Sequence, residues 1–196
     1  MHSQICQILD FMVEIEKLKD VHRQTRPVGL TRFENSAEHS WHVCLTALMF
    51  KDYANEPVDI DRVIRMLLIH DLGEIDAGDT IIYASETPEN KAAEEQGVRR
   101  LLALLPDEQQ QREYLALWLE FEAGESADAR FAKAMDRVPP LMQNLNGGGH
   151  SWQKHGISKN QVLQINRRIG RGVAPLWEVL EQKLDKAEAD GLLRRE

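Results

Sequence analysis

Cysteine is scarce in this sequence. Its 196 residues include two, Cys6 and Cys44, and each lies among apolar neighbours, as reduced structural thiols usually do. Two thiolates cannot build the three- or four-cysteine cage of a structural zinc site. A metal ion in this protein would therefore be held by histidine and carboxylate side chains.

Long apolar runs are also missing. The longest, such as residues 101–105, are far shorter than the roughly 20 residues that a membrane helix needs. The N-terminal segment carries Asp10, Glu14 and Glu16, where a secretory signal peptide would be apolar. We therefore expect a protein without a membrane partner, located in the cytoplasm.

Positive charge is in deficit, with 24 Lys and Arg against 32 Asp and Glu and a net charge of −8. A negative surface repels nucleic acid unless a basic stripe is set apart for it, and the basic residues form only small groups such as Arg23, Arg26 and Arg32. This balance argues against a polynucleotide partner. A hydrophobic fraction of 42% and a charged fraction of 29% indicate a globular protein, and the length indicates one domain over residues 1–196.

Helical periodicity dominates what is present. Apolar residues recur at spacings of three and four from Ile5 to Leu18, and no strand-like alternation is found. Pro139–Pro140 should kink or stop the helix around them. The sequence predicts an all-α bundle of about seven or eight helices, with motifs in residues 1–145 and C-terminal helices, residues 158–190, packed on them. Helix-start signals lie at Asn35, Asp59, Thr87–Pro88, Asp107, Ser126 and Ser158.

Four polar residues interrupt the core pattern of these helices: His39, the adjacent pair His70–Asp71, and Asp136. Each alone is better explained as a hydrogen-bonded core residue or helix-end partner. Together they would be costly to bury, because carboxylates among apolar neighbours lose their hydration and need a positive charge nearby to compensate. One divalent ion would satisfy all of them, and their mixed nitrogen and oxygen donors suit Mn, Co, Ni, Fe or Zn, with Mg a further candidate.

The order of these residues resembles the signature of the HD-domain metal-dependent phosphohydrolases. The strings Glu34-Asn35-Ser36-Ala37-Glu38-His39-Ser40 and His70-Asp71-Leu72-Gly73-Glu74, followed by Gly78-Asp79, look like the subfamily of 5′-deoxynucleotidases. By this resemblance His39, His70, Asp71 and Asp136 are metal ligands, and Glu74 acts with Asp71 in catalysis. The substrate-binding residues would be Arg23 and Asp79.

Chemical reasoning from the residues supports these roles. If the helix continues past Asp71, Glu74 lies four residues from His70 on one face, where it could act as a general acid or base. A metal with two aspartates is about neutral, so a dianionic phosphate needs a fixed cation. Arg23 could provide it, with Arg32 as a second candidate. Asp79 could hold a ribose hydroxyl or the leaving oxygen, although an Asp after Gly is more often a turn residue.

The expected function is removal of the 5′-phosphate of nucleoside monophosphates, or of a related small phosphate ester. The deoxynucleotidases that this chain resembles carry tryptophan directly after the phosphate-binding arginine, whereas this chain has Gln24, so selectivity for 2′-deoxy sugars stays open. The resemblance also implies a homodimer. Two alternatives remain: an HD-type phosphodiesterase or pyrophosphohydrolase acting on another small nucleotide, and a non-catalytic helical dimer stabilised by a structural metal.

Overall fold

The computed structural model describes residues 1–80 and 87–194, and within these ranges it contains α-helices and no strand. Three helices, α4, α8 and α10, have six residues or fewer, and the other eight agree with the predicted number. The all-α prediction is therefore confirmed. The helices are α1 (His2–Ile15), α2 (Ser36–Phe50), α3 (Ile60–Ile69), α4 (Glu74–Ala77), α5 (Pro88–Leu102), α6 (Glu108–Ala123), α7 (Ala127–Asn146), α8 (His150–His155), α9 (Lys159–Asn166), α10 (Arg168–Gly172) and α11 (Ala174–Ala189). The 3₁₀ turns are η1 (Glu16–Asp20) and η2 (Lys51–Tyr53).

The helices begin at the predicted residues. The Asn35 side chain accepts a hydrogen bond from the Glu38 backbone N–H, and Ser158 forms a complete capping box with Gln161. The same chemistry starts α3, α5, α6 and α7, because a side-chain oxygen satisfies an N–H group that has no partner within the helix. The capping residues of these four helices are Asp59, Thr87, Asp107 and Ser126.

The helix α7 does not stop at its two prolines. It runs through Pro139 and Pro140 and ends at Asn146. Proline cannot donate the backbone hydrogen bond, so the carbonyl groups of Met135 and Asp136 lose their usual helical donors. Burial offsets this cost, because α7 lies in the middle of the fold and Met135 is fully buried.

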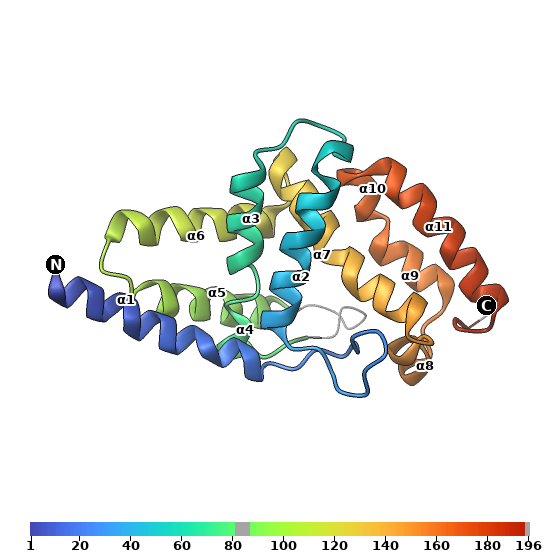
Figure 1. Ribbon diagram of the computed structural model, residues 1–196, viewed down its shortest axis with the longest axis horizontal. Helices are drawn as coiled ribbons and strands as arrows, with labels where there is room; N and C mark the ends of the chain where they lie inside the picture. Colours follow the sequence, from blue (N-terminus) through green and yellow to red (C-terminus); the bar gives the residue numbers. More distant parts are fainter. Residues whose placement is uncertain (81–86, 195–196) are drawn as a thin grey trace.

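The fold has a centre and two ends. In Figure 1, α2, α3 and α7 occupy the middle, α1, α5 and α6 extend toward one end, and α8 to α11 form the other end. One buried apolar cluster joins the centre to the C-terminal helices and includes Val43, Met135 and Leu184. A second buried apolar cluster, which includes Leu101 of α5 and Trp118 of α6, packs these two helices together. The site described below lies where these parts meet.

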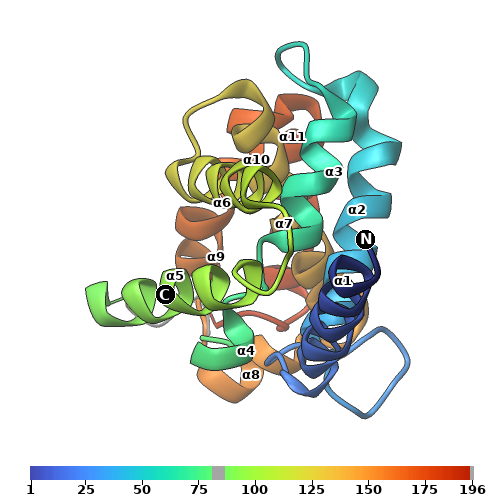
Figure 2. The same cartoon turned by 90° about the vertical axis from the view of Figure 1, so that its left-hand side faces the viewer.

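The first helix is a helix as predicted, but it contains no buried residue. Its apolar stripe is exposed, and α1 extends along one edge of the molecule in Figures 1 and 2. Cys6 lies on this exposed helix, whereas Cys44 is buried. Among the described residues, none of the helices is both long and apolar enough to cross a membrane. The stripe consists of Ile5, Ile8, Leu9, Met12 and Val13.

Candidate metal centre and its cleft

Three separate parts of the chain bring His39, His70 and Asp136 together. His39 comes from α2, His70 follows α3 directly, and Asp136 lies in the middle of α7. Asp136 Oδ1 is 2.8 Å from His39 Nε2 and 3.6 Å from His70 Nε2. All three residues are buried, and one nitrogen or oxygen atom of each lies within 4.8 Å of the others. These atoms could hold one metal ion.

The hydrogen bonds of His70 show that this donor set fits a cation. His70 Nδ1 donates to the Leu67 carbonyl oxygen at 2.7 Å, so in the neutral ring Nε2 carries a lone pair. That lone pair faces Asp71 Oδ1 at 3.0 Å and Asp136 Oδ1, which are also acceptors. Burial lowers the pKa of His70, but the charges of Asp71 and Asp136 outweigh it and raise the pKa to about 9. The position therefore attracts a proton or a metal ion.

Asp71 lies at the edge of this group. Its Oδ2 atom is 4.0 Å from His39 Nε2 and accepts a hydrogen bond from Arg23 Nη1 at 2.9 Å. Its Oδ1 atom faces His70. Asp71 is thus shared between the candidate metal ligands and the candidate phosphate-binding arginine.

Arg23 is surrounded by carboxylates. Its Nη1 atom lies 2.9 Å from Asp71 Oδ2, 3.7 Å from Asp79 Oδ1 and 3.8 Å from Glu74 Oε1, and its Nε atom lies 3.8 Å from Glu34 Oε2. Arg23 lies on an irregular segment, residues 23–34, that we call the arm, and a backbone hydrogen bond from Arg23 N to the Glu34 carbonyl, 2.9 Å long, fixes its two ends together. Burial lowers the pKa of Arg23, but the charges of Asp71, Glu74 and Asp79 more than compensate and raise it. Arg23 is therefore a permanent cation in an acidic setting.

Glu74 reaches the same place, although the helix does not continue past Asp71 as the sequence reasoning assumed. The helix α3 ends at Ile69, and turns lead to α4, which begins at Glu74. Glu74 Oε2 accepts a hydrogen bond from Ser36 Oγ at 2.6 Å. Burial first, and then the charge of Asp71, raise the pKa of Glu74 well above its usual value. This carboxyl group can hold a proton at a pH where an exposed glutamate is ionised.

The two remaining predicted residues differ in position. The Asp79 side chain is 8% exposed and lines the cleft, and burial raises its pKa despite the nearby charge of Arg23. Arg32 is not brought into the cleft: its side chain is 55% exposed and pairs with Glu38 at 2.9 Å. The structure therefore gathers Arg23 and Asp79 with the metal group and leaves Arg32 on the outside of the arm.

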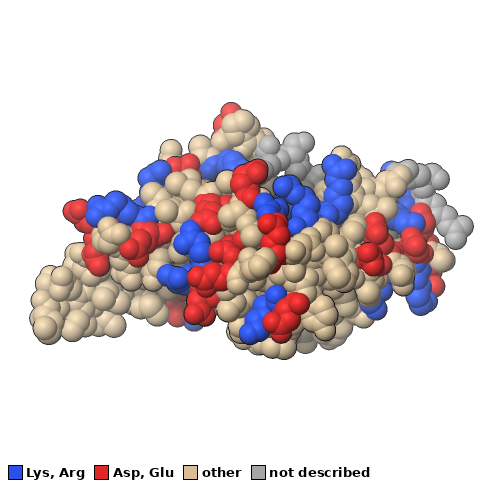
Figure 3. Space-filling view, turned by 90° about the horizontal axis from the view of Figure 1, so that it is seen from above, with Lys and Arg blue, Asp and Glu red and all other residues tan. Residues whose placement is uncertain are grey.

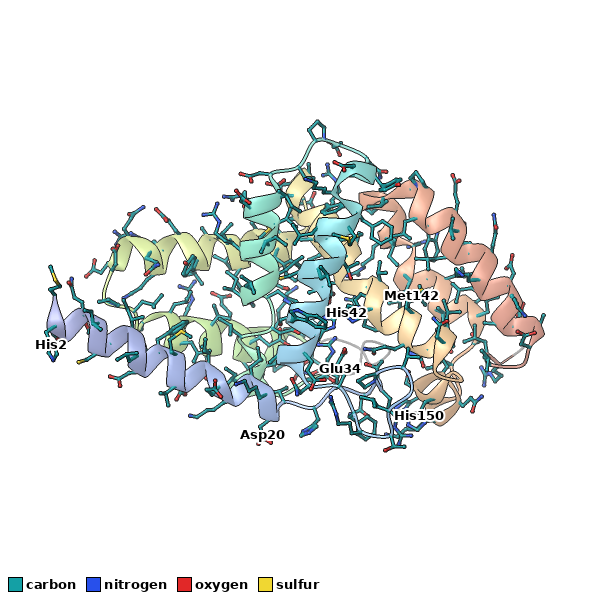
Figure 4. All side chains as sticks on the ribbon, viewed as in Figure 1. His2, Asp20, Glu34, His42, Met142 and His150 are labelled. Atoms are coloured by element: carbon teal, nitrogen blue, oxygen red, sulfur yellow. The ribbon has the colours of Figure 1, made fainter. Side chains whose placement is uncertain are left out.

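Glu34 belongs to the site, but sequence reasoning gave it no role. Its Oε2 atom lies 3.6 Å from His39 Nδ1 and 3.8 Å from Arg23 Nε, while Oε1 accepts a hydrogen bond from Gln143 Nε2. Figure 4 shows Glu34 at the N-terminal end of α2. A carboxylate behind a ligating histidine orients its ring. The available signal was a charged residue directly before a helix cap, five residues before His39.

The metal group opens into a cleft of about 300 Å³. Arg23, Asp71, Glu74 and Asp79 line one part of it. Lys133 and Arg137 of α7 and Arg168 of α10 line another part, and Gln24 also contributes. The volume is in the range of small-molecule sites, which begins at about 300 Å³.

Comparison with known families identifies the class of protein. Residues 15–177 match the family described as HD domain, so the chain belongs to the HD domain family. In the solved structures it is similar to a protein from Magnetospirillum magnetotacticum MS-1 that is described as a predicted metal-dependent phosphohydrolase. That protein is 44% identical, with a TM-score of 0.91, and the match covers 98% of this chain and 100% of the other.

Two curated relatives carry the name 5′-deoxynucleotidase HDDC2. The Bos taurus protein is 33% identical over 139 residues, and the Homo sapiens protein is 31% identical over 139 residues. Each match covers 69% of this chain. It spans 65% of the bovine protein and 66% of the human protein, just under two thirds of their length.

Proposed function

We propose that this protein is a metal-dependent phosphomonoesterase acting on nucleoside 5′-monophosphates. The observation that carries the proposal is that His39, His70 and Asp136 converge behind a cleft, which His70 and Asp136 line together with Glu74, a carboxyl group with a raised pKa. The name 5′-deoxynucleotidase of the bovine and human relatives supports the substrate class. We assign His39, His70, Asp71 and Asp136 to one divalent ion, whose identity among Mn, Co, Ni, Fe, Zn and Mg is left to experiment.

The ion would polarise the phosphate and activate a water molecule. Glu74 is the residue that moves a proton: its raised pKa allows it to carry one and give it to the leaving alkoxide oxygen. Ser36 Oγ holds the carboxyl group in place by its hydrogen bond to Oε2. Arg23 balances the charge that develops on the phosphoryl oxygens, and Asp79 accepts a hydrogen bond from the sugar or holds the leaving oxygen.

A panel of substrates and metals tests this proposal. Purified protein is freed of metal, supplied separately with Mn, Co, Ni, Fe, Mg or Zn, and assayed for phosphate release from paired ribo- and deoxynucleoside 5′-monophosphates. A nucleoside triphosphate and bis(p-nitrophenyl) phosphate serve as pyrophosphate and diester substrates. We expect metal-stimulated release from the monophosphates, with the ribo/deoxy ratio reporting the effect of Gln24. Hydrolysis of the diester or triphosphate alone would overturn the proposal, and His70→Ala serves as the inactive control.

We also propose that residues 1–196 form one domain and that the chain acts as a homodimer in the cytoplasm. The shared apolar cluster of α2, α7 and α11 supports the single domain. The apolar stripe of α1 supports the dimer, because five large apolar side chains of one helix lie exposed together. Sedimentation of wild type and Leu9→Glu tests the dimer, which the variant should weaken. Cell fractionation tests the location.

A further inference from the structure

A second group of cations lines the cleft, away from Arg23 in the sequence. Lys133 and Arg137 come from α7, and Arg168 comes from α10. A neighbouring cavity of about 350 Å³ is lined by Lys133 and Arg168 as well. Three further arginines, one from α7, one from α10 and one between α9 and α10, also line it. Figure 3 shows Lys and Arg side chains gathered in the middle of one face. The additional arginines are Arg130, Arg167 and Arg171.

The positive charge of this group is only partly balanced. Arg137 Nε lies 3.5 Å from Asp136 Oδ2, but it is buried without a hydrogen-bond partner. Lys133 Nζ lies 3.6 Å from Glu122 Oε1. Within residues 1–80 and 87–194, Arg168 has no carboxylate within ion-pair distance. Burial lowers the pKa of Lys133, and the charges of Arg137 and Arg168 lower it further, although Glu122 and Asp136 oppose them.

The incompletely balanced positive charge of Lys133, Arg137 and Arg168 contrasts with the charge of Arg23, which carboxylates surround. Arg23 already faces four carboxylates, from Glu34, Asp71, Glu74 and Asp79. Like charges held together in a cleft destabilise the fold unless an anion joins them. The cations of α7 and α10 are therefore less fully balanced by carboxylates than Arg23 is, and they can bind a further anionic group besides the one at Arg23.

We propose that Lys133, Arg137 and Arg168 bind a second phosphate group of the substrate. The substrate would then be a nucleotide with phosphates at two separate positions, one cleaved at the metal group and one held by these cations. The guanidinium groups match a phosphate by paired hydrogen bonds, and a single cleft contains both sets of residues, so one molecule can reach both. This inference rests on the proposed phosphomonoesterase function and narrows its substrate.

Binding to metal-free protein tests the inference without relying on turnover. Calorimetry compares adenosine 3′,5′-bisphosphate, adenosine 5′-monophosphate and inorganic phosphate on wild type, Arg168→Gln and Arg168→Lys. Arg168 is exposed, so its substitution leaves the fold intact. The matched control is Arg112→Gln, which removes the same charge from an exposed position on α6. We expect wild type to bind the bisphosphate about 10-fold more tightly than the monophosphate, as one charge-assisted hydrogen bond would give.

The Arg168→Gln substitution should remove most of this preference, Arg168→Lys should restore part of it, and Arg112→Gln should leave it unchanged. Equal affinity of wild type for the two nucleotides would overturn the inference. Binding of inorganic phosphate as tight as that of the bisphosphate would also overturn it, because the site would then hold free phosphate.

Turnover assays separate this inference from the proposed function. If adenosine 5′-monophosphate and the bisphosphate are cleaved equally well and Arg168→Gln changes neither rate, the second phosphate site is wrong and the phosphatase stands. If neither nucleotide is cleaved with any of the metals, but the bisphosphate binds in an Arg168-dependent manner, the phosphatase is wrong and the anion site stands.

Discussion

The two sides of the cleft carry opposite charge. On the side formed by the arm and α4, one arginine, Arg23, faces four carboxylates. On the side formed by α7 and α10, Lys133, Arg137 and Arg168 share few carboxylates. The chain as a whole has a net charge of −8, so its overall balance hides this separation. In the two proposals above, the acidic side holds the metal ion and transfers the proton, whereas the basic side binds an anion.

The largest expected effect comes from removing the oxygen that both histidines face. The substitution Asp136→Ala should abolish metal retention and lower kcat/KM by about three orders of magnitude or more. Metal content after dialysis and phosphate release measure the two effects. Asp185→Ala, which removes an exposed carboxylate of α11, serves as the matched control. An Asp136→Ala protein that retains its metal and full activity would remove Asp136 from the site.

The next effect separates catalysis from stability. Glu74→Gln should retain metal and lower kcat by about 10²- to 10⁴-fold, because the proton donor is lost. A carboxyl group with a raised pKa stabilises the folded protein below the unfolded pKa, near 4.5, and this contribution is lost as the pH rises. The melting temperature of metal-free Glu74→Gln should therefore exceed that of wild type by more at pH 8 than at pH 5. An unchanged kcat would contradict the role of Glu74.

A smaller effect is expected from Glu34, which lies behind the metal ligand His39. Glu34→Gln removes the charge 3.6 Å from His39 Nδ1 and should weaken metal affinity by about 10- to 100-fold, because the ring of His39 loses its orienting partner. Competition with a coloured chelator measures this affinity. Glu108→Gln, an exposed residue of α6, should leave it unchanged. If Glu34→Gln binds metal as tightly as wild type, Glu34 has only a packing role.

The smallest effect distinguishes the two arginines of the arm. Arg23→Lys keeps the charge but loses the guanidinium fork, so KM should rise about 10-fold. Arg32→Lys should change KM by less than about twofold, because an exposed ion pair contributes little. Steady-state kinetics of both variants provide the comparison. If the two variants raise KM equally, Arg32 also binds the substrate, contrary to this prediction.

The sequence predicted the parts of this molecule that depend on local chemistry. Capping residues such as Asn35 and Ser158 act within one helical turn, so their positions predicted where α2 and α9 begin. The sequence left open whether α7 kinks or stops at Pro139 and Pro140, because packing in the centre of the fold decides that the helix continues to Asn146.

Long-range placement was harder to predict. The spacing of His39, His70, Asp71 and Asp136 indicated a common site through a resemblance, and the fold brings these residues together. The outward position of Arg32 depends on the path of the arm, which the bridge between His22 and Asn35 helps to fix. Likewise Arg137 and Arg168 are 31 positions apart in the sequence and line one cleft only after α10 packs on α7.

One helix, α7, carries residues of both sides of the cleft, with Asp136 next to Arg137 and one turn beyond Lys133. The distance between the metal group and the nearest cations is thus set by a rise of about 1.5 Å per residue. Loop movement cannot change the spacing of Lys133, Asp136 and Arg137 along α7. The helix therefore fixes how far apart the two phosphate groups of a bound substrate must lie. A one-residue insertion between Lys133 and Asp136 would change the angle between these two side chains around the helix axis by about 100° and their spacing along the axis by about 1.5 Å, and so select a different molecule, or none.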